Sequence, residues 1–252
     1  MKQAAAVALV LVMMLACARK TQEVEITNEG HHHLVLENEL VRVFQVEVGP
    51  HDATLMHRHR HDYLFVSLGS ATVSNEVEGK AAAQLKLQDG QTGFLAGKFA
   101  HIARNLAASP FRNVTIELLQ DEKARTAPQP KWDEERGMQV LHGGTQEILF
   151  VKDGARVSEI ELQSGGMMPS HHHNGPQLLV AVSDLDLRSD VESQGATPVQ
   201  LKSGDVKWIP GGYTHTLTNL GKQPAKFVTV EFPRGGEAGC PSRKFPLAPN
   251  FD

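Results

Sequence analysis

Three histidines in the second half of the chain have the residue type and spacing of a metal site. His171 and His173 are two residues apart, so on a β-strand their side chains share one face, while His172 points to the other. His215 lies on a later predicted strand. Imidazole nitrogens that converge from two strands form a donor set suited to a divalent first-row metal, whereas the alternative is that these are solvated loop histidines.

The first half of the chain repeats this set at one constant interval. Three histidines precede the first set by 114 residues each: His57, His59 and His101. The same interval pairs identical residues of other types: Arg42 with Arg156, Asn105 with Asn219, and Glu117 with Glu231. No gap is needed between Arg42 and Glu117, so the pattern indicates an internal duplication with one site in each half.

These residues resemble the cupin superfamily, whose second motif is roughly G-x5-P-x-G-x2-H-x3-N. The second half matches that motif at each named position: Gly204, Pro210, Gly212, His215 and Asn219. The first half has Ala96 and Lys98 in place of the proline and the glycine. The resemblance implies an all-β fold of two tandem antiparallel jelly-roll (cupin) barrels with a three-histidine metal site in each. It also implies that Asn105 and Asn219 support the fold.

The expected fourth ligand is missing from both halves. Where the first cupin motif usually has glutamate, this chain has Gln177 in one half and Tyr63 in the other. The resemblance is therefore closer to three-histidine cupin dioxygenases, which act on β-diketones, thiols or hydroxy acids, than to the glutamate-bearing oxalate enzymes. Gln177 and Tyr63 are the candidate catalytic residues, since each could contact a chelated ligand. His61 continues the alternation of the first site and is either a further ligand or a rim residue.

Two functions remain open from these residues. The first is a metal-dependent oxidoreductase, a dioxygenase of a small organic acid or an enolisable substrate. The second is a non-catalytic protein of the cell envelope that binds a metal or a small ligand. In both, the cofactor is a divalent transition metal (Fe, Mn, Zn, Ni or Cu), and the partner is a small anionic or chelating molecule. The second half keeps the fuller motif, so we expect the better site there.

Composition and the first residues of the chain indicate its domain count, its partners and its expected location. The 252 residues suit two small domains, and a net charge of −4 without a basic stripe argues against nucleic acid. Residues 1–18 read as a secretory signal, because the apolar run is shorter than the about 20 residues that span a bilayer. Cys17 follows a lipobox-like stretch. The expected location is therefore the periplasm, with a lipid anchor at Cys17 or as a free protein.

The predicted organisation follows from the repeat. We expect an N-terminal barrel over 24–120, a linker over 121–144, a C-terminal barrel over 145–233 and a Gly/Pro-rich tail over 234–252, which contains Cys240. A homodimer is one alternative for the assembly.

Alternation within the predicted strands assigns faces to particular residues. In the strand over 111–119, Val114, Ile116 and Leu118 form the predicted core face, with Glu117 opposite. We expect Glu117 and Glu231 to have a hydrogen-bonding or interface role. The segment His31-His32-His33 is not repeated, and we expect it to be a surface patch.

Overall fold

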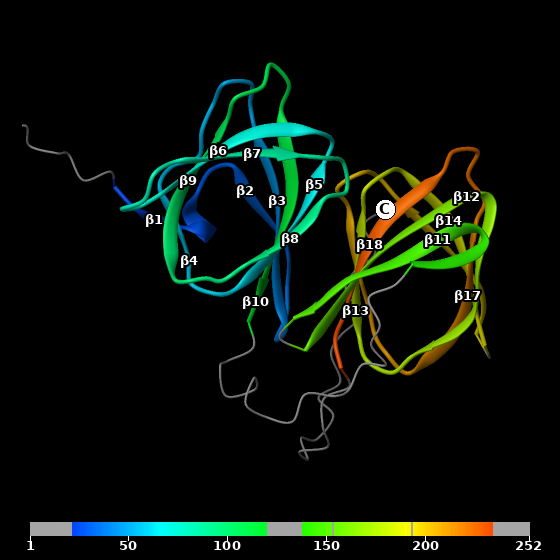
Figure 1. The fold of residues 1–252 in the computed structure, drawn as a ribbon. Helices are drawn as coiled ribbons and strands as arrows, with labels where there is room; N and C mark the ends of the chain where they lie inside the picture. Colours follow the sequence, from blue (N-terminus) through cyan, green and yellow to red (C-terminus); the bar gives the residue numbers. More distant parts are fainter. Residues whose placement is uncertain (1–21, 120–137, 153, 193, 234–252) are drawn as a thin grey trace, which may run out of the picture.

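The computed structural model describes residues 22–119, 138–152, 154–192 and 194–233. Two β-barrels lie side by side, the first coloured blue to green and the second green to red-orange (Figure 1). Apart from one short 3-10 turn, η1 (Ile26–Asn28), the regular structure of the described residues is β-strand. The predicted fold class, two tandem antiparallel barrels, is confirmed. The predicted signal, Cys17, the tail and Cys240 lie outside the described residues.

The N-terminal barrel consists of two five-stranded sheets. The first sheet has the order β1 (Val24–Glu25), β4 (His57–His59), β9 (Phe99–Asn105), β6 (Ala71–Val77) and β7 (Ala83–Leu87). The second has the order β2 (His32–Glu37), β3 (Val41–Val48), β10 (Phe111–Leu118), β5 (Tyr63–Leu68) and β8 (Thr92–Leu95). All neighbours are antiparallel except β1 and β4, which pair in parallel.

The C-terminal barrel is one continuous antiparallel sheet. Its order is β15 (Gly195–Leu201), β14 (Leu185–Val191), β17 (Tyr213–Asn219), β12 (Ala155–His173), β18 (Ala225–Glu231), β13 (Gln177–Ala181) and β16 (Val206–Ile209). The strand β11 (Met138–Lys152) pairs with β12 and begins within the segment predicted as linker. The long β12 pairs with β18 through its first part and with β17 through its last part, so it connects both sides of the barrel.

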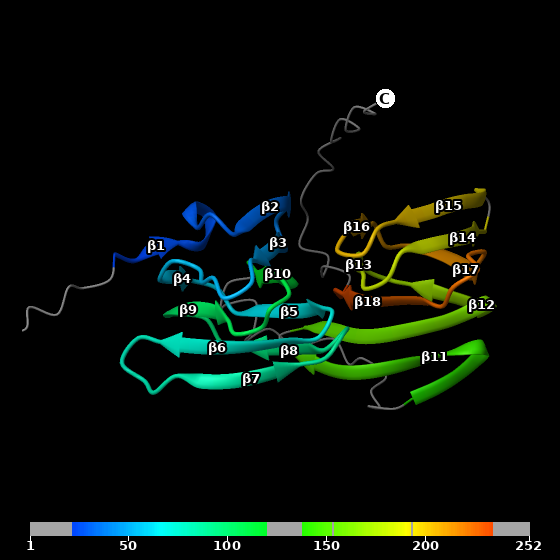
Figure 2. The ribbon, with the colours of Figure 1, turned by 90° about the horizontal axis from the view of Figure 1, so that it is seen from above.

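The barrels share an apolar core between them. Alternate residues of β10 and β5, such as Val114 and Val66, pack with their repeat partners Val228 and Val180 on β18 and β13. The opposite faces of these strands line the two barrel interiors. A strand that is covered on both faces reads as a continuous apolar run, which explains the runs in β5 and β13. Figure 2 shows the two barrels in contact through these strands.

Polar contacts fix the edge of this interface. Gln45 Nε2 donates to the carbonyl oxygen of Gly204 at 2.9 Å, and Arg112 Nη2 donates to that of Ser203 at 3.1 Å. From the other barrel, Lys226 Nζ donates to the carbonyl oxygen of Asp89 at 3.2 Å. The repeat turns that contain Gly90 and Gly204 thus have two roles: each connects two strands of its own barrel and contacts the other barrel.

Two motif asparagines hold the turns that follow the histidine strands. Asn219 Nδ2 lies 2.9–3.2 Å from the carbonyl oxygens of Leu162, Gln163 and Gln223, and its Oδ1 accepts from Gly221 N at 2.9 Å. Asn105 makes the equivalent contacts in the first barrel. These side chains point to backbone atoms, which supports the structural role expected for them.

Replacing Asn219 by alanine is expected to destabilise the protein by about 3 kcal/mol, because it leaves several buried backbone groups without partners. Chemical denaturation followed by circular dichroism measures this loss. Metal content of the folded variant should be unchanged, since Asn219 is not part of the histidine group. A loss below about 1 kcal/mol would contradict the structural role.

One turn carries a strained residue where the motif has glycine. Gly212 has φ +82°, in the left-handed region, and its repeat partner Lys98 has φ +69°. Glycine adopts this conformation without steric penalty, whereas a residue with a Cβ does so at a cost of about 1 kcal/mol. The departure of the first half from the motif therefore changes the residue but not the shape of the turn.

Within the part of the chain that the structure describes, no helix has the length and hydropathy that crossing a membrane would require.

Candidate metal centres

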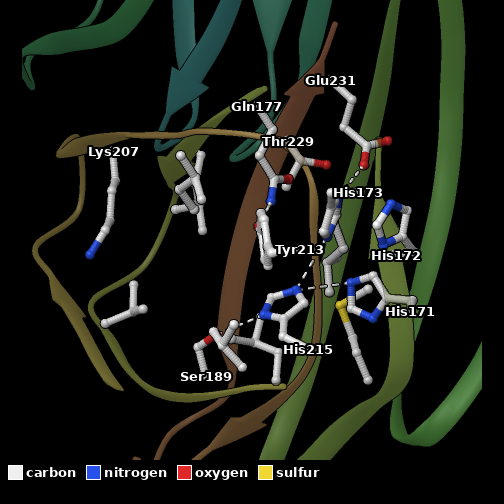
Figure 3. Close-up of a pocket in the computed structure, with 18 of the residues that line it drawn as sticks. His171, His172, His173, Gln177, Ser189, Lys207, Tyr213, His215, Thr229 and Glu231 are labelled. Atoms are coloured by element: carbon white, nitrogen blue, oxygen red, sulfur yellow. Dashed lines mark hydrogen bonds and ion pairs between the residues drawn. The ribbon is translucent and has the colours of Figure 1, made fainter. Parts of the chain in front are cut away.

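The C-terminal group lies at the point where β12 and β17 pair. His171 is directly opposite His215 in the register, and His173 follows two residues along β12 on the same face. The Nε2 atoms of His171 and His173 lie 3.1 and 3.2 Å from Nε2 of His215 (Figure 3). His172 points away and makes a contact of 3.0 Å with Thr214 Oγ1. The alternation predicted from the sequence therefore brings the three histidines together.

Each of these rings has a partner on its outer nitrogen. Nδ1 of His171 donates to the carbonyl oxygen of Pro169 at 2.7 Å, and Nδ1 of His173 donates to Glu231 Oε1 at 2.8 Å. Nδ1 of His215 lies 2.7 Å from the hydroxyl oxygen of Ser189. A carbonyl or carboxylate oxygen only accepts, so it fixes the proton on Nδ1 and leaves the lone pair of Nε2 facing the other rings.

Converging Nε2 lone pairs repel one another unless a cation lies between them. Two nitrogens bound at about 2.1 Å and at right angles to a metal ion are roughly 3.0 Å apart, close to the spacing of the Nε2 atoms. Burial, with the charges of His171 and His173, lowers the pKa of His215 to about 3, so this ring is a neutral donor at neutral pH. Burial also lowers the pKa of His171. The donor set therefore fits a divalent first-row metal.

The N-terminal group repeats this geometry. His57 and His59 on β4 lie opposite β9, where His57 pairs directly with His101. Nε2 of His59 is 3.2 Å from Nε2 of His101, and Nδ1 of His101 donates to Asn75 Oδ1 at 2.6 Å. Asn75 is the repeat partner of Ser189, so this outer hydrogen bond is also duplicated. Nε2 of His57 is buried without a hydrogen-bond partner among the described residues, as expected of an atom that binds a metal.

Burial is stronger in this first group. Burial, together with the charge of His32, lowers the pKa of both His57 and His59 to about 3. The pKa of His101 falls to about 2, again mainly through burial. These three rings are therefore neutral donors as well.

The two groups differ in the carboxylate behind the second histidine. In the C-terminal barrel, Glu231 bonds to His173, and Arg156 Nε donates to Glu231 Oε2 at 2.6 Å. Burial raises the pKa of Glu231, but the hydrogen bond from His173 and the charge of Arg156 outweigh it, so the net pKa is lowered. The hydrogen-bonding role expected of Glu231 is present, but the expectation that this residue lies away from the histidines is wrong, because β18 pairs with β12 and brings it to His173. The identity of Glu231 with Glu117 across the repeat was the signal in the sequence.

In the N-terminal barrel the equivalent carboxylate does not form a hydrogen bond to its histidine. Glu117 Oε1 lies 3.7 Å from His59 Nδ1, too far for a hydrogen bond, and both atoms lack partners among the described residues. Arg42 Nη1 lies 3.3 Å from Glu117 Oε2. Here burial dominates, and the net pKa of Glu117 is raised. The first site therefore lacks the charged acceptor that orients the histidine in the second.

The barrels also differ in the space beside the histidines. A cavity of about 440 Å³ opens onto the C-terminal group, whereas the N-terminal group has only about 80 Å³. His32 packs against His57 with ring centroids 4.6 Å apart, and Tyr63 stacks on His59 at 4.0 Å. The side chain of His32 is 5% exposed and Nδ1 bonds to Glu29 at 2.6 Å, so the expected surface patch is wrong for His32.

Gln177 and Tyr63 occupy equivalent positions but different surroundings. Gln177 is buried, its Nε2 donates to the hydroxyl oxygen of Tyr213 at 2.5 Å, and its Oε1 has no partner among the described residues. Tyr213 stacks on His173 at 5.0 Å, as Tyr63 does on His59. Sequence reasoning missed Tyr213, although it precedes His215 by two residues and so shares its face. His61 lies outside the three-histidine group.

Comparisons with known proteins support the fold. No family model matches the sequence, and no match is found among curated proteins. A structure of oxalate decarboxylase from Bacillus subtilis at pH 4.6 aligns with a TM-score of 0.56 and 14% identity over 78% of this chain and 69% of that chain.

A second structure of that enzyme, described for its Mn(II) centres, aligns with a TM-score of 0.57 and 14% identity over 83% of this chain and 76% of that chain. A third structure of oxalate decarboxylase, described for its substrate binding mode, has the same values. At this identity the likeness concerns the fold. The chain therefore has the fold of the bicupins, with a group of three histidines in each of its two barrels.

Proposed function

We propose that the C-terminal barrel binds a divalent transition metal and acts as a dioxygenase of a small organic acid or an enolisable substrate. The observation that carries this proposal is the cavity of about 440 Å³, which reaches the three convergent Nε2 atoms. Pockets of this size are typical of small-molecule sites. The N-terminal group, which has little space beside it, has a structural or supporting role in this proposal.

The charge of the site favours an anionic ligand. The three histidines supply imidazole nitrogens and no carboxylate, and Gln177, which stands where the fourth ligand is expected, is an uncharged amide. Glu231 lies behind His173 and is paired with Arg156, so its charge is largely balanced. A bound divalent ion would supply Lewis acidity and positions for two ligand oxygens, and iron would add oxygen chemistry.

Gln177 and Tyr213 are the groups that would orient the ligand. Burial raises the pKa of Tyr213 to about 12, although the hydrogen bond from Gln177 opposes this, so the phenol keeps its proton at neutral pH. Its hydroxyl already accepts from Gln177 and can donate to a ligand oxygen. Gln177 Oε1 is the acceptor left for a ligand hydroxyl. Tyr213 would thus bind an oxygen of the ligand that accepts a hydrogen bond, and Gln177 would bind a hydroxyl that donates one.

One observation favours the non-catalytic alternative. Among the described residues of the cavity wall, Glu231 is the one carboxylate, and it is held by His173 and Arg156. A general base needs a proton acceptor within reach of the substrate. A protein that only stores or captures a metal or a chelating anion would not need one.

The deciding experiment is purification of the protein from the cell envelope, elemental analysis, and oxygen uptake with β-diketones, hydroxy acids and oxalate. Iron with oxygen-dependent turnover of one of these compounds supports the dioxygenase. Tightly held zinc or copper without turnover supports the binding role. Carbon dioxide release from oxalate without oxygen consumption would contradict both and point to the chemistry named for the structural neighbours.

Replacing Gln177 by glutamate is expected to tighten divalent metal binding in the C-terminal barrel by roughly tenfold, because it adds a negative charge in the buried position of the missing ligand. Competition with a chelator measures the affinity. The Gln223→Glu variant, with the same change outside the cavity, serves as the control. Weaker or unchanged binding in Gln177→Glu would mean that this side chain does not face the metal.

Export to the periplasm is also proposed, on the sequence of residues 1–18 alone. Mass spectrometry of the mature N-terminus distinguishes the alternatives. Diacylglycerol on Cys17 supports the lipid anchor, and an unmodified start at Arg19 supports a free periplasmic protein. An uncleaved Met1 would contradict export by this signal.

A further inference from the structure

The large cavity contains a lysine that the histidine site does not use. Lys207 is on β16, two residues before Ile209, and both side chains line the cavity of the C-terminal barrel. Figure 3 shows Lys207 on the far side of the cavity from His171, His173 and His215. Lys207 therefore brings an ammonium group to the wall of a cavity that a small ligand can enter.

Lys207 has no partner within the described residues. No hydrogen bond or ion pair involves its Nζ there, whereas the other cation of the cavity wall, Arg156, is bound to Glu231. The side chain is exposed to the cavity and to solvent, so a ligand that enters the cavity can reach the ammonium group. It is therefore the available positive charge of this wall.

The first barrel fills the same place differently. The repeat partner of Lys207 is Gly93, and a Cβ on Gly93 would lie 2.5 Å from the ring of Phe65. Phe65 is in turn the repeat partner of Leu179, which pairs with Lys207. The N-terminal barrel has thus closed this volume with an aromatic ring, while the C-terminal barrel has a smaller side chain, a cavity and an ammonium group.

We propose that Lys207 binds a second anionic group of the ligand, whose chelating head lies at the three histidines. This inference rests on the proposed function, and it names the ligand class: a 2-oxo or 2-hydroxy acid with a distal carboxylate. The cavity has the volume of roughly fifteen water molecules, several times that of oxalate, so a longer diacid suits it. The distal carboxylate would meet Lys207 while the head displaces water at the histidines.

The test compares two acids that share a head group and a carbon count. Calorimetry on the Mn(II)-loaded protein measures the Kd of 2-oxoglutarate, which has a distal carboxylate, and of 2-oxopentanoate, which lacks it. The wild type should bind the diacid about tenfold more tightly, since a hydrogen bond between charged groups contributes on that scale. The Lys207→Met variant should lose this preference, and Lys207→Arg should retain most of it.

A matched control removes the same charge elsewhere. Lys222 is exposed on a turn of the C-terminal barrel and does not line the cavity, so Lys222→Met should keep the preference for the diacid. A preference that survives in Lys207→Met, or that is absent from the wild type, overturns the role of Lys207 but leaves the chelating site intact. If neither acid binds the wild type, the proposed function fails, and the role of Lys207 fails with it.

Discussion

Replacing His215 by alanine is expected to empty the C-terminal barrel of metal while the N-terminal barrel stays loaded. His215 supplies the nitrogen that lies next to both other Nε2 atoms, at 3.1 and 3.2 Å. Two histidines on one strand bind a metal ion weakly, so the metal affinity should fall by more than about a hundredfold. That loss exceeds the one observed when a residue that hydrogen-bonds to a metal ligand is replaced. Metal analysis after dialysis against a weak chelator should give half the wild-type metal content per chain.

The fold should survive this change. The apolar cluster of the second barrel, which includes Leu187, Leu217 and Phe227, does not depend on the imidazole. Circular dichroism and the unfolding midpoint of the metal-free variant test this directly. The mirrored variant, His101→Ala, should empty the first barrel instead and leave the second loaded.

His172 provides the matched control. It lies between two members of the group, but its ring faces the other side of β12 and contacts Thr214. His172→Ala should therefore keep the wild-type metal content. Equal loss in His172→Ala and His215→Ala would mean that metal is bound by the surface run of histidines and not by the group inside the barrel.

The part of the site that sequence predicted best is the part that periodicity controls. His171 and His173 share a face because residues two apart on any strand do, and the repeat interval then located His57, His59 and His101. Their convergence with His215 needs only that the two strands pair, as β12 and β17 do. The repeat and the motif together were sufficient for the fold class.

Periodicity does not say which face of a strand is the inside of a barrel. In β10, Val114, Ile116 and Leu118 were predicted to form the core face, and they do form a core, but it lies between the barrels. Glu117, on the other face, points towards the first histidine group. Strands buried on both faces have two cores, so an apolar face alone does not separate them.

The difference between the two cavities also lies beyond pattern reading. It arises from contacts between residues far apart in the chain, such as His32 against His57 and Phe65 over Gly93. The local sequence around each of these residues does not indicate these contacts. The repeat register shows that the positions differ, but only the packing shows that the differences close one site and open the other.

The second prediction with a large expected effect concerns the carboxylate behind His173. Replacing Glu231 by glutamine is expected to weaken metal binding in the C-terminal barrel by about 10–100-fold, the range observed for residues that orient a metal-binding histidine. The amide oxygen can still accept from Nδ1 of His173, but the negative charge that makes the imidazole a stronger donor is lost, and Arg156 loses its ionic partner. A chelator competition titration in the His101→Ala background, where only the second site binds, measures the change.

The repeat supplies the control for this prediction, and the comparison decides between two explanations. Glu117→Gln, measured in the His215→Ala background, changes the equivalent residue where the contact with His59 is open at 3.7 Å. If the hydrogen bond to the ring carries the effect, this variant should lose only a few-fold in affinity. If the loss comes from the total charge of the barrel, both variants should weaken metal binding at their sites equally, because each removes one carboxylate paired with one arginine. Equal losses of affinity would therefore contradict the role assigned to Glu231. A loss confined to the second site would show that the hydrogen bond between Glu231 and His173 strengthens metal binding there.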